Sequence, residues 1–187
     1  HTPFPGSLQS AFLTALSNEF EAFDQKMGWS AAVYKNGMLW LDAIGLANES
    51  TPMTTSTPMA IMSTSKTFLS ALILSQVDDG LYELDDLISV LLADHSDYQS
   101  ADKSLIPDAT VEQLLRMASG VQEVSKNSIE AYLQSLDPNW KPSDLFTLVS
   151  GPPIPPGTHN YTTPSSFLLG LVAEHKGGDN LHALYQS

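Results

Sequence analysis

Residues 63–79 form the most apolar segment of the chain and constrain its fold more than any other feature. This segment predicts a helix that ends at Asp79-Gly80 and carries apolar side chains on nearly every side. These side chains are Phe68, Leu69, Ala71, Leu72, Ile73, Leu74 and Val77. A helix that is apolar all round is normally buried, so the sequence predicts a domain packed around this segment.

A β-hairpin is predicted before this helix. Residues 29–34 and 38–44 are strand-like, and the Asn36-Gly37 pair between them is a strong hairpin signal. Apolar residues at helical spacing predict an amphipathic helix over about residues 8–26. Further helices are expected over residues 84–92, 111–117, 129–136, 142–149 and 167–174.

The composition excludes several kinds of site. The 187 residues include 8 Lys and Arg against 21 Asp and Glu, and a net charge of −13 argues against nucleic acid and anionic membrane surfaces as partners. No apolar run is long enough to span a membrane. The absence of cysteine excludes disulfides, thiolate zinc sites and a cysteine nucleophile. The histidines lack the paired spacing of zinc sites, and no glycine-rich phosphate loop follows a strand, so we expect no metal or cofactor.

The start of the chain bears on its compartment. The sequence opens at His1 without a basic region followed by an apolar one, so we expect any signal peptide to have been removed. Together with the acidic composition, this leads us to expect a secreted or periplasmic protein.

Ser63 and Lys66 stand three residues apart at the start of the apolar helix. On a helix, residues i and i+3 share a face, so the lysine ammonium can reach the serine hydroxyl. A serine is a poor nucleophile until a base takes its proton, and a lysine can be that base when its surroundings lower its pKa. The helix N-terminus adds free N–H groups and a positive field where an oxyanion would form. The pattern therefore indicates a serine nucleophile with a lysine base.

The same spacing occurs a second time, at Ser100 and Lys103. That pair lies in a polar stretch with no apolar helix behind it, so the context favours Ser63 and Lys66. From the residues alone, a structural alternative stays open. In that alternative Ser63 caps the helix, and Lys66 covers apolar neighbours with its stem while its ammonium reaches water.

Four segments follow one another in an order that is known from one family. They are Thr57–Phe68 around Ser63, Asp79–Asp86, Ala109–Gly120, and Pro155-Pro156-Gly157 through Tyr161 to Gly170. The last three are similar to the patterns G-K-L-x-L-D-D, I-T-I-x-x-L-L-x-H-T-S-G and P-P-G-x-x-F-x-Y-S-N…L-L-G. Together they resemble the serine β-lactamase, penicillin-binding protein and D-alanyl-D-alanine carboxypeptidase superfamily, especially its class C and esterase-like branch. The resemblance covers most of the chain, from about Trp29 to Gly178.

The resemblance implies a role for each candidate catalytic residue. Ser63 would form a covalent acyl-enzyme, Lys66 would be its base, and Tyr161 would share proton transfer with Lys66 and protonate the leaving group. The implied activity is that of a serine hydrolase acting on ester or amide bonds of a small molecule or peptide. Thr163 stands where the family usually has asparagine, so it is the expected substrate-binding residue, with a hydroxyl in place of an amide. That change favours an esterase or amidase over an efficient β-lactamase. It also keeps open a non-catalytic binding or regulatory protein on the same scaffold.

The resemblance also implies the fold and a partner. We expect an α+β, β-lactamase-like fold in which a helical lobe joins an antiparallel sheet flanked by helices. Residues 1–62 would give the N-terminal helix and first hairpin, and residues 63–187 the nucleophile helix and a mostly helical lobe. Family members continue with a strand that carries Lys-Thr-Gly or His-x-Gly and the second oxyanion donor, and nothing after Tyr161 resembles it. Because a two-stranded sheet is not stable alone, we expect a second polypeptide, or the rest of a longer protein, to supply the missing strands.

Overall fold

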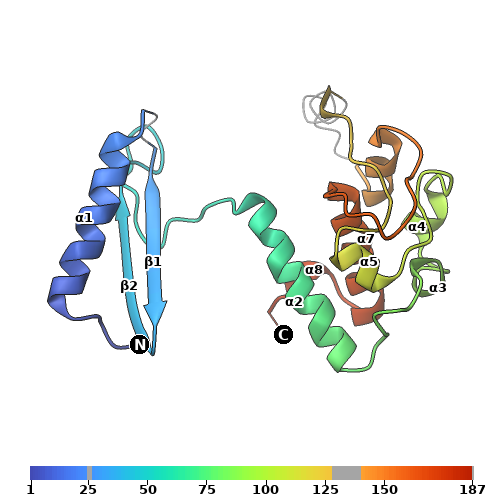
Figure 1. Cartoon of the computed structure of the whole chain (residues 1–187), viewed down its shortest axis with the longest axis horizontal. Helices are drawn as coiled ribbons and strands as arrows, with labels where there is room; N and C mark the ends of the chain where they lie inside the picture. The colour runs from blue at the N-terminus through green and yellow to red at the C-terminus, as the bar shows by residue number, and fades with distance from the viewer. Residues whose placement is uncertain (25–26, 128–139, 187) are drawn as a thin grey trace. The chain divides into compact units, whose positions relative to one another are not determined.

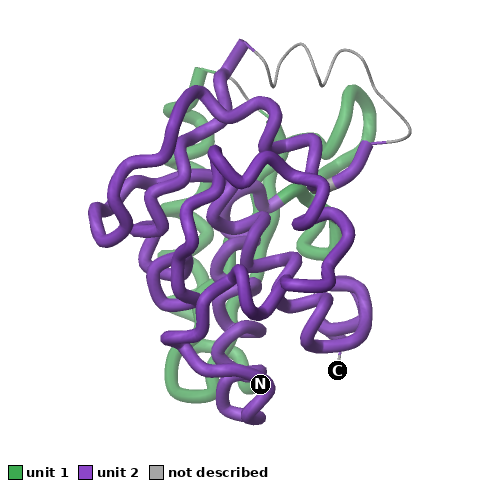
Figure 2. The backbone as a smooth tube through the Cα atoms, turned by 90° about the vertical axis from the view of Figure 1, so that its right-hand side faces the viewer, with its two compact units in different colours: residues 1–60 green, residues 61–187 purple. Residues whose placement is uncertain are grey.

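A computed structural model describes residues 1–24, 27–127 and 140–186 of the chain. The chain divides into two compact units, residues 1–60 (unit 1) and residues 61–187 (unit 2), which Figure 2 colours separately. This boundary lies two residues before the one expected after residue 62. None of the helices in the described ranges has both the length and the apolar character needed to cross a membrane.

Unit 1 is a helix packed on a β-hairpin (Figure 1). Strands β1 (Trp29–Lys35) and β2 (Met38–Ile44) pair antiparallel along their whole length. The two turn residues, Asn36 and Gly37, have φ values of 51° and 77°, the left-handed backbone that a two-residue type I′ turn requires. The hairpin predicted from the Asn-Gly pair is therefore confirmed.

The N-terminal helix α1 (Gly6–Ala22) ends before the expected residue 26. Phe23 leaves the helix with an extended backbone, and its ring packs edge-on against Trp29 of β1 with the ring centroids 5.4 Å apart. This aromatic contact with the hairpin takes the place of the last predicted helical turn. Buried Phe4, Leu16 and Trp40 form the small core of unit 1.

The described residues of unit 2 form short helices and two longer ones (Figure 1). In chain order these are η1 (Met62–Thr64), α2 (Ser65–Asp78), α3 (Ile88–Leu91), α4 (Ser96–Ser100), α5 (Val111–Leu115), η2 (Pro142–Leu148), α7 (Thr163–Gly177) and α8 (Leu181–Leu184). The helices expected over residues 84–92 and 111–117 are present in shorter form, and that over 142–149 is a 3₁₀ helix. Helices α4 and α8 have no counterpart among the expected elements. The helix expected over residues 129–136 lies outside the described residues.

Local sequence determines where the helices around the candidate site begin and end. The Thr110 hydroxyl accepts the N–H of Gln113, and the Gln113 side chain accepts the N–H of Thr110, which is the capping box that starts α5. Helix α7 has Pro164 in its first turn and ends at Gly178, whose φ of 74° is the left-handed conformation of a helix C-cap.

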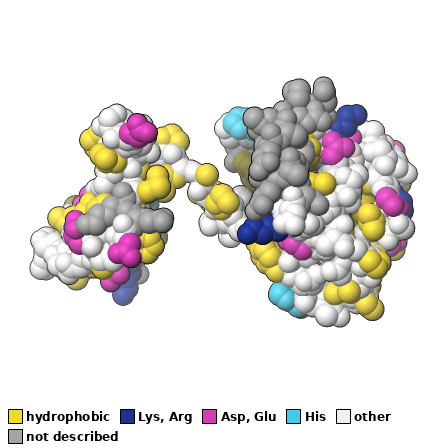
Figure 3. All heavy atoms as spheres, turned by 90° about the horizontal axis from the view of Figure 1, so that it is seen from above, with side chains coloured by type: hydrophobic (Ala, Val, Ile, Leu, Met, Phe, Trp, Pro, Cys, Tyr) yellow, Lys and Arg dark blue, Asp and Glu magenta, His cyan; other side chains and the backbone are white. Residues whose placement is uncertain are grey.

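Helix α7, rather than α2, is the helix buried on nearly all sides. All residues from Leu168 to Ala173 are buried, and α7 contacts α2, α3, α5, η2 and α8. Helix α2 buries Leu69 and Ile73, whereas Phe68 and Leu74 are 57% and 50% exposed. The expectation that α2 is buried all round is therefore wrong for unit 2, because unit 2 covers only one face of it. Hydrophobic side chains reach the surface of both units (Figure 3).

Candidate active site

Ser63 and Lys66 lie where a 3₁₀ turn runs into an α-helix. Ser63 is the middle residue of η1, and Lys66 belongs to the first turn of α2. The Lys66 ammonium donates a hydrogen bond to Ser63 Oγ over 3.2 Å. Ser63 is exposed and Lys66 is half-buried. The contact expected from the spacing of the two residues is therefore present, and the serine is open to solvent.

Met62, directly before Ser63, has a strained backbone. Its φ is 47°, the left-handed region, although its side chain is 80% exposed. Such a conformation costs a non-glycine residue about 1–3 kcal/mol and is found most often at functional sites. Because the exposed side chain of Met62 gains little from packing, the neighbouring structure must hold the turn that presents Ser63.

Tyr161 reaches the same place from the loop before α7. The Lys66 ammonium lies 5.2 Å from the centroid of the Tyr161 ring. Hydrogen bonding with Ser63, and next with Lys66, lowers the pKa of the Tyr161 phenol, and the charge of Lys66 acts in the same direction. The Tyr161 side chain is exposed. The structure thus brings together Ser63, Lys66 and Tyr161 from two separate segments of unit 2.

Backbone hydrogen bonds tie the loop that carries Tyr161 to residues 117–120. The N–H groups of Ile154, Gly157 and Asn160 donate to the carbonyls of Gly120, Ala118 and Met117 over 2.9, 2.7 and 2.7 Å. Buried hydroxyls add a second connection, since Ser165 Oγ lies 2.7 Å from Thr162 Oγ1 and 3.0 Å from Ser119 Oγ. The residues on both sides of Tyr161 are therefore fixed to the same segment.

We expect Gly120→Ala to destabilise unit 2 by about 3 kcal/mol or more, since it adds both backbone strain and a clash. The φ of Gly120 is 88°, and a Cβ there would lie 2.1 Å from the carbonyl oxygen of Ile154. Gly157→Ala is the matched control, because Gly157 has a φ of 99° but no atom within 4 Å of its Cβ position. It should cost only about 1–2 kcal/mol. Urea unfolding measures the loss of stability in each variant. Equal losses in the two variants would contradict the close approach of Gly120 to the Ile154 carbonyl.

Thr163, the first residue of α7, has its polar groups against Glu123. Glu123 Oε2 accepts the Thr163 N–H over 2.8 Å and the Thr163 hydroxyl over 3.2 Å, and Glu123 Oε1 accepts the N–H of Val124 over 2.7 Å. The negative charge of Glu123 raises the pKa of Tyr161, against the larger effects that lower it. The hydroxyl that was expected to bind substrate therefore donates to a carboxylate of the protein itself.

Glu123 is absent from the site residues that the sequence predicted. It is 40 residues from Thr163, so no helical or strand spacing connects the two. A single carboxylate in a chain with 21 acidic residues is also no signal by itself. One indication was available in the sequence. Glu123 lies three residues after Gly120, the last residue of a segment that resembles the family pattern.

The second Ser-x-x-Lys sequence forms no such pair. Ser100 Oγ donates to the carbonyl of Asp97 over 3.0 Å. The Lys103 ammonium donates to the carbonyl of Tyr98 and lies 4.0 Å from the centroid of that residue's ring. Burial lowers the pKa of Lys103, but its ammonium bonds to backbone carbonyls rather than to Ser100. The structure thus distinguishes the two Ser-x-x-Lys sequences, because only Lys66 contacts the serine three residues before it.

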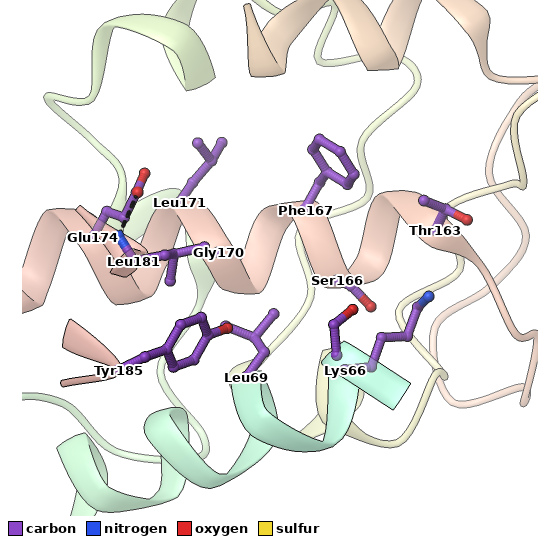
Figure 4. A pocket seen from close by; sticks show the side chains of 11 residues that line it. Lys66, Leu69, Thr163, Ser166, Phe167, Gly170, Leu171, Glu174, Leu181 and Tyr185 are labelled. Atoms are coloured by element: carbon purple, nitrogen blue, oxygen red, sulfur yellow. Dashed lines mark hydrogen bonds between the residues drawn. The ribbon is translucent and has the colours of Figure 1, made fainter. Parts of the chain in front are cut away.

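A pocket of about 460 Å³ adjoins Lys66 and lies among α2, α7 and α8. Lys66 and Thr163 lie toward one end, and Tyr185 lies toward the other (Figure 4). The apolar side chains among its walls are Leu69, Phe167, Leu171 and Leu181. Pockets of this size and character hold small molecules or parts of larger ones.

His175 lies next to two other side chains of metal-ligating types, Asp94 and His95. His175 Nε2 lies 2.9 Å from Asp94 Oδ1, and the His175 ring packs edge-on against His95. Within residues 1–24, 27–127 and 140–186, no three His, Cys, Asp or Glu side chains gather in a way that could hold a metal ion.

Comparisons with known proteins agree with one another. The family model described as Beta-lactamase matches residues 16–185. No curated protein matches the chain. Among solved structures, the chain is similar to a penicillin binding protein from Bacillus halodurans, with 21% identity, 92% of this chain covered and a TM-score of 0.72. It is also similar to D-amino acid amidase from Ochrobactrum anthropi SV3, complexed with L-phenylalanine amide (19% identity, 95% covered, TM-score 0.71).

A third similar structure is EstCE1, described as a hydrolase with promiscuous acyltransferase activity, with 16% identity, 96% of this chain covered and a TM-score of 0.71. At these identities the likeness concerns the fold. The chain spans only about half the length of these proteins, covering 53%, 48% and 49% of the three chains.

Proposed function

Because the chain belongs to the beta-lactamase family, we propose that it is a serine hydrolase that acts on ester or amide bonds through an acyl-enzyme on Ser63. The chain has the β-lactamase-like fold, and its neighbours include a penicillin-binding protein, an amidase and a hydrolase. The observation that carries the proposal is the hydrogen bond of 3.2 Å from the Lys66 ammonium to Ser63 Oγ. It places the amine that would act as the base, in its neutral form, within hydrogen-bond distance of the hydroxyl of an exposed serine.

In the proposed reaction, Ser63 Oγ attacks the carbonyl carbon of the substrate while its one proton passes to the neutral amine of Lys66, which transfers it to Tyr161. The tetrahedral intermediate then collapses, the bond to the leaving oxygen or nitrogen breaks, and Tyr161 returns a proton to the leaving group. Water, activated by the same two residues, hydrolyses the ester on Ser63 and regenerates the hydroxyl. The lowered pKa of Tyr161 supports its role, because it makes the phenolate more accessible near neutral pH.

The proposed oxyanion site needs residues beyond those in this chain. One donor is the N–H of Ser63, which lies at the start of the helix where the positive end of the dipole points. The described residues contain a two-stranded sheet, and the chain spans about half the length of the structures it matches. We assign the second donor to further strands, from a second polypeptide or the rest of a longer protein. The exposed apolar side chains of α2 would gain from such a partner.

The proposed substrates are small esters, small amides or peptides. An apolar part of the substrate fits the pocket whose walls include Leu69 and Phe167, because Lys66 belongs both to this pocket and to the contact with Ser63. The neighbours described as an amidase and as a hydrolase support this choice of substrate classes.

The proposal is tested by the kinetics of a chromogenic ester. The assembled protein is this chain together with the strands that complete its sheet. Mixing it with excess p-nitrophenyl acetate should release about one equivalent of nitrophenol rapidly and then continue more slowly, because this activated ester should acylate Ser63 faster than water removes the acetyl group. Stopped-flow absorbance measures the burst, and intact mass measures the acetylated protein. Ser100→Ala should behave like the wild type. An acetyl group found on a residue other than Ser63 would contradict the proposed acyl-enzyme, and no turnover in the assembled protein would favour a non-catalytic role.

A further inference from the structure

The contact between Glu123 and Thr163 joins two segments on which the site depends. Thr163 follows Tyr161 by two residues, and its N–H and hydroxyl both donate to one carboxylate oxygen of Glu123. We propose that Glu123 is a positioning residue for Tyr161, fixing through Thr163 the segment that holds the phenol beside Lys66. This inference rests on the proposed function, because the position of Tyr161 matters for a reaction at Ser63.

The contact between Thr163 and Glu123 is a strong one. A hydrogen bond from an N–H to a carboxylate is about twice as strong as one between neutral groups, and the bond from the Thr163 N–H has a length of 2.8 Å. This N–H belongs to the first residue of α7, where the helix leaves its N–H groups without helical partners and favours negative charge. Glu123 therefore stabilises the first residue of α7 and, with it, the position of the residues just before the helix.

Glu123 is itself held in place by hydrogen bonds. Its carbonyl accepts the N–H of Ser150 over 3.0 Å, and the carbonyl of Leu148 accepts the N–H of Ser125 over 3.0 Å. Val124 and Val149 form a β-bridge in the same short pairing. The second carboxylate oxygen of Glu123 accepts the N–H of Val124 over 2.7 Å. With both oxygens and its backbone engaged, Glu123 is a fixed support rather than a mobile surface carboxylate.

The charge of Glu123 also acts on Tyr161. The Glu123 carboxylate accepts two N–H groups and one hydroxyl, and among the described residues no lysine, arginine or histidine forms an ion pair with it. Hydrogen bonds with Ser63 and Lys66 lower the pKa of Tyr161 and favour its phenolate. The negative charge of Glu123 raises that pKa and favours the neutral phenol. Glu123 thus counteracts part of the effect of Lys66 on the pKa of Tyr161 and favours the neutral phenol, the form that can donate a proton to the leaving group.

The same geometry offers a second reason for a threonine at position 163. The Thr163 hydroxyl adds a donor to Glu123 beside the backbone N–H of the same residue. Thr163→Val removes only the hydroxyl, so it should weaken the support of Tyr161 less than the loss of the carboxylate does.

The test compares Glu123→Ala and Glu123→Gln in the assembled protein. Glu123→Ala should lower kcat for ester hydrolysis about 100-fold with KM nearly unchanged, because a small displacement of a catalytic group has a cost of this size. Glu123→Gln keeps an acceptor oxygen but loses the charge, and it should recover most of the lost kcat. Its pH profile should differ from that of the wild type. The limb that Tyr161→Phe abolishes should move to lower pH, because without the negative charge the phenol ionises more readily.

Two further measurements make the outcome decisive. Ultraviolet difference titration against Tyr161→Phe follows the Tyr161 phenol without any turnover, and it should show the same shift to lower pH in Glu123→Gln. Glu112→Gln, which removes an exposed carboxylate paired with Arg116, should change neither kcat nor the titration. The same Tyr161 titration in wild type and Glu123→Gln would overturn the inference, as would a Glu123→Ala protein that is less stable but has an unchanged kcat. Wild-type turnover in Ser63→Ala would instead refute the proposed function. The titration of Tyr161 would still test whether Glu123 influences that residue, because it does not depend on turnover.

Discussion

Ser63→Ala is expected to lower kcat for ester hydrolysis by on the order of 10⁴ to 10⁶, the loss found when a serine nucleophile is removed from a comparable hydrolase. Ser63 Oγ is the hydroxyl to which the Lys66 ammonium donates, over 3.2 Å. The hydroxyl of Ser65, in the next turn, donates instead to the carbonyl of Met62 over 2.7 Å, so it is not poised to replace Ser63. Steady-state turnover of a chromogenic ester measures the loss.

The interpretation of this variant requires that its fold be intact. Ser63 is exposed and its side chain is not part of a core. The free energy of unfolding of Ser63→Ala should therefore lie within about 0.5 kcal/mol of the wild-type value. Ser100→Ala, from the second Ser-x-x-Lys sequence, is the matched control and should retain full turnover, because Ser100 bonds to a backbone carbonyl. A Ser63→Ala protein with more than a tenth of wild-type turnover would mean that another group is the nucleophile.

Lys66→Met is expected to lower kcat by about 10² to 10⁴, the usual contribution of a general base. Lys66→Arg is the more informative variant. Arginine keeps the positive charge beside Tyr161 but cannot lose its proton. Lys66→Arg should therefore lose nearly as much activity as Lys66→Met. Both variants should be compared with Lys103→Met, which removes a lysine at the same spacing from the second pair and should leave turnover unchanged. Stopped-flow measurement of acylation isolates the affected step.

The result with arginine distinguishes two roles of Lys66. Near wild-type acylation in Lys66→Arg would show that Lys66 supplies charge alone and that Tyr161 is the base. In that case the lowered pKa of Tyr161 would depend on the cation that lies 5.2 Å from its ring. Full activity in Lys66→Met would contradict any role for Lys66.

Local signals predicted the parts of the fold that depend on neighbouring residues. The Asn36-Gly37 turn gave the hairpin because the required backbone conformation is nearly specific to such pairs. The spacing of Ser63 and Lys66 gave their contact because i and i+3 meet on any helical turn. The end of α1 was misplaced because Phe23 packs against Trp29, a contact that helical spacing does not reveal.

Long-range packing explains what the sequence did not predict. Helices α2 and α7 both carry apolar side chains on several faces, and only the structure shows that unit 2 surrounds α7 and covers one side of α2. Glu123 was missed for the same reason, since its contact with Thr163 spans 40 residues and needs the pairing of the segments around Val124 and Val149. The family resemblance identified Tyr161 as a candidate, but not the Glu123 carboxylate that accepts hydrogen bonds from nearby Thr163.

The most direct test of the central claim is to identify the residue that a fluorophosphonate labels in the assembled protein. After labelling, proteolysis and mass spectrometry of all serine-containing peptides, we expect a single adduct, on Ser63 in the peptide that spans residues 61–68. Labelling should be lost in Ser63→Ala and slowed strongly in Lys66→Met, because the hydroxyl needs its base. An adduct on another serine, or labelling of the same extent in Ser63→Ala, would contradict Ser63 as the nucleophile of this chain.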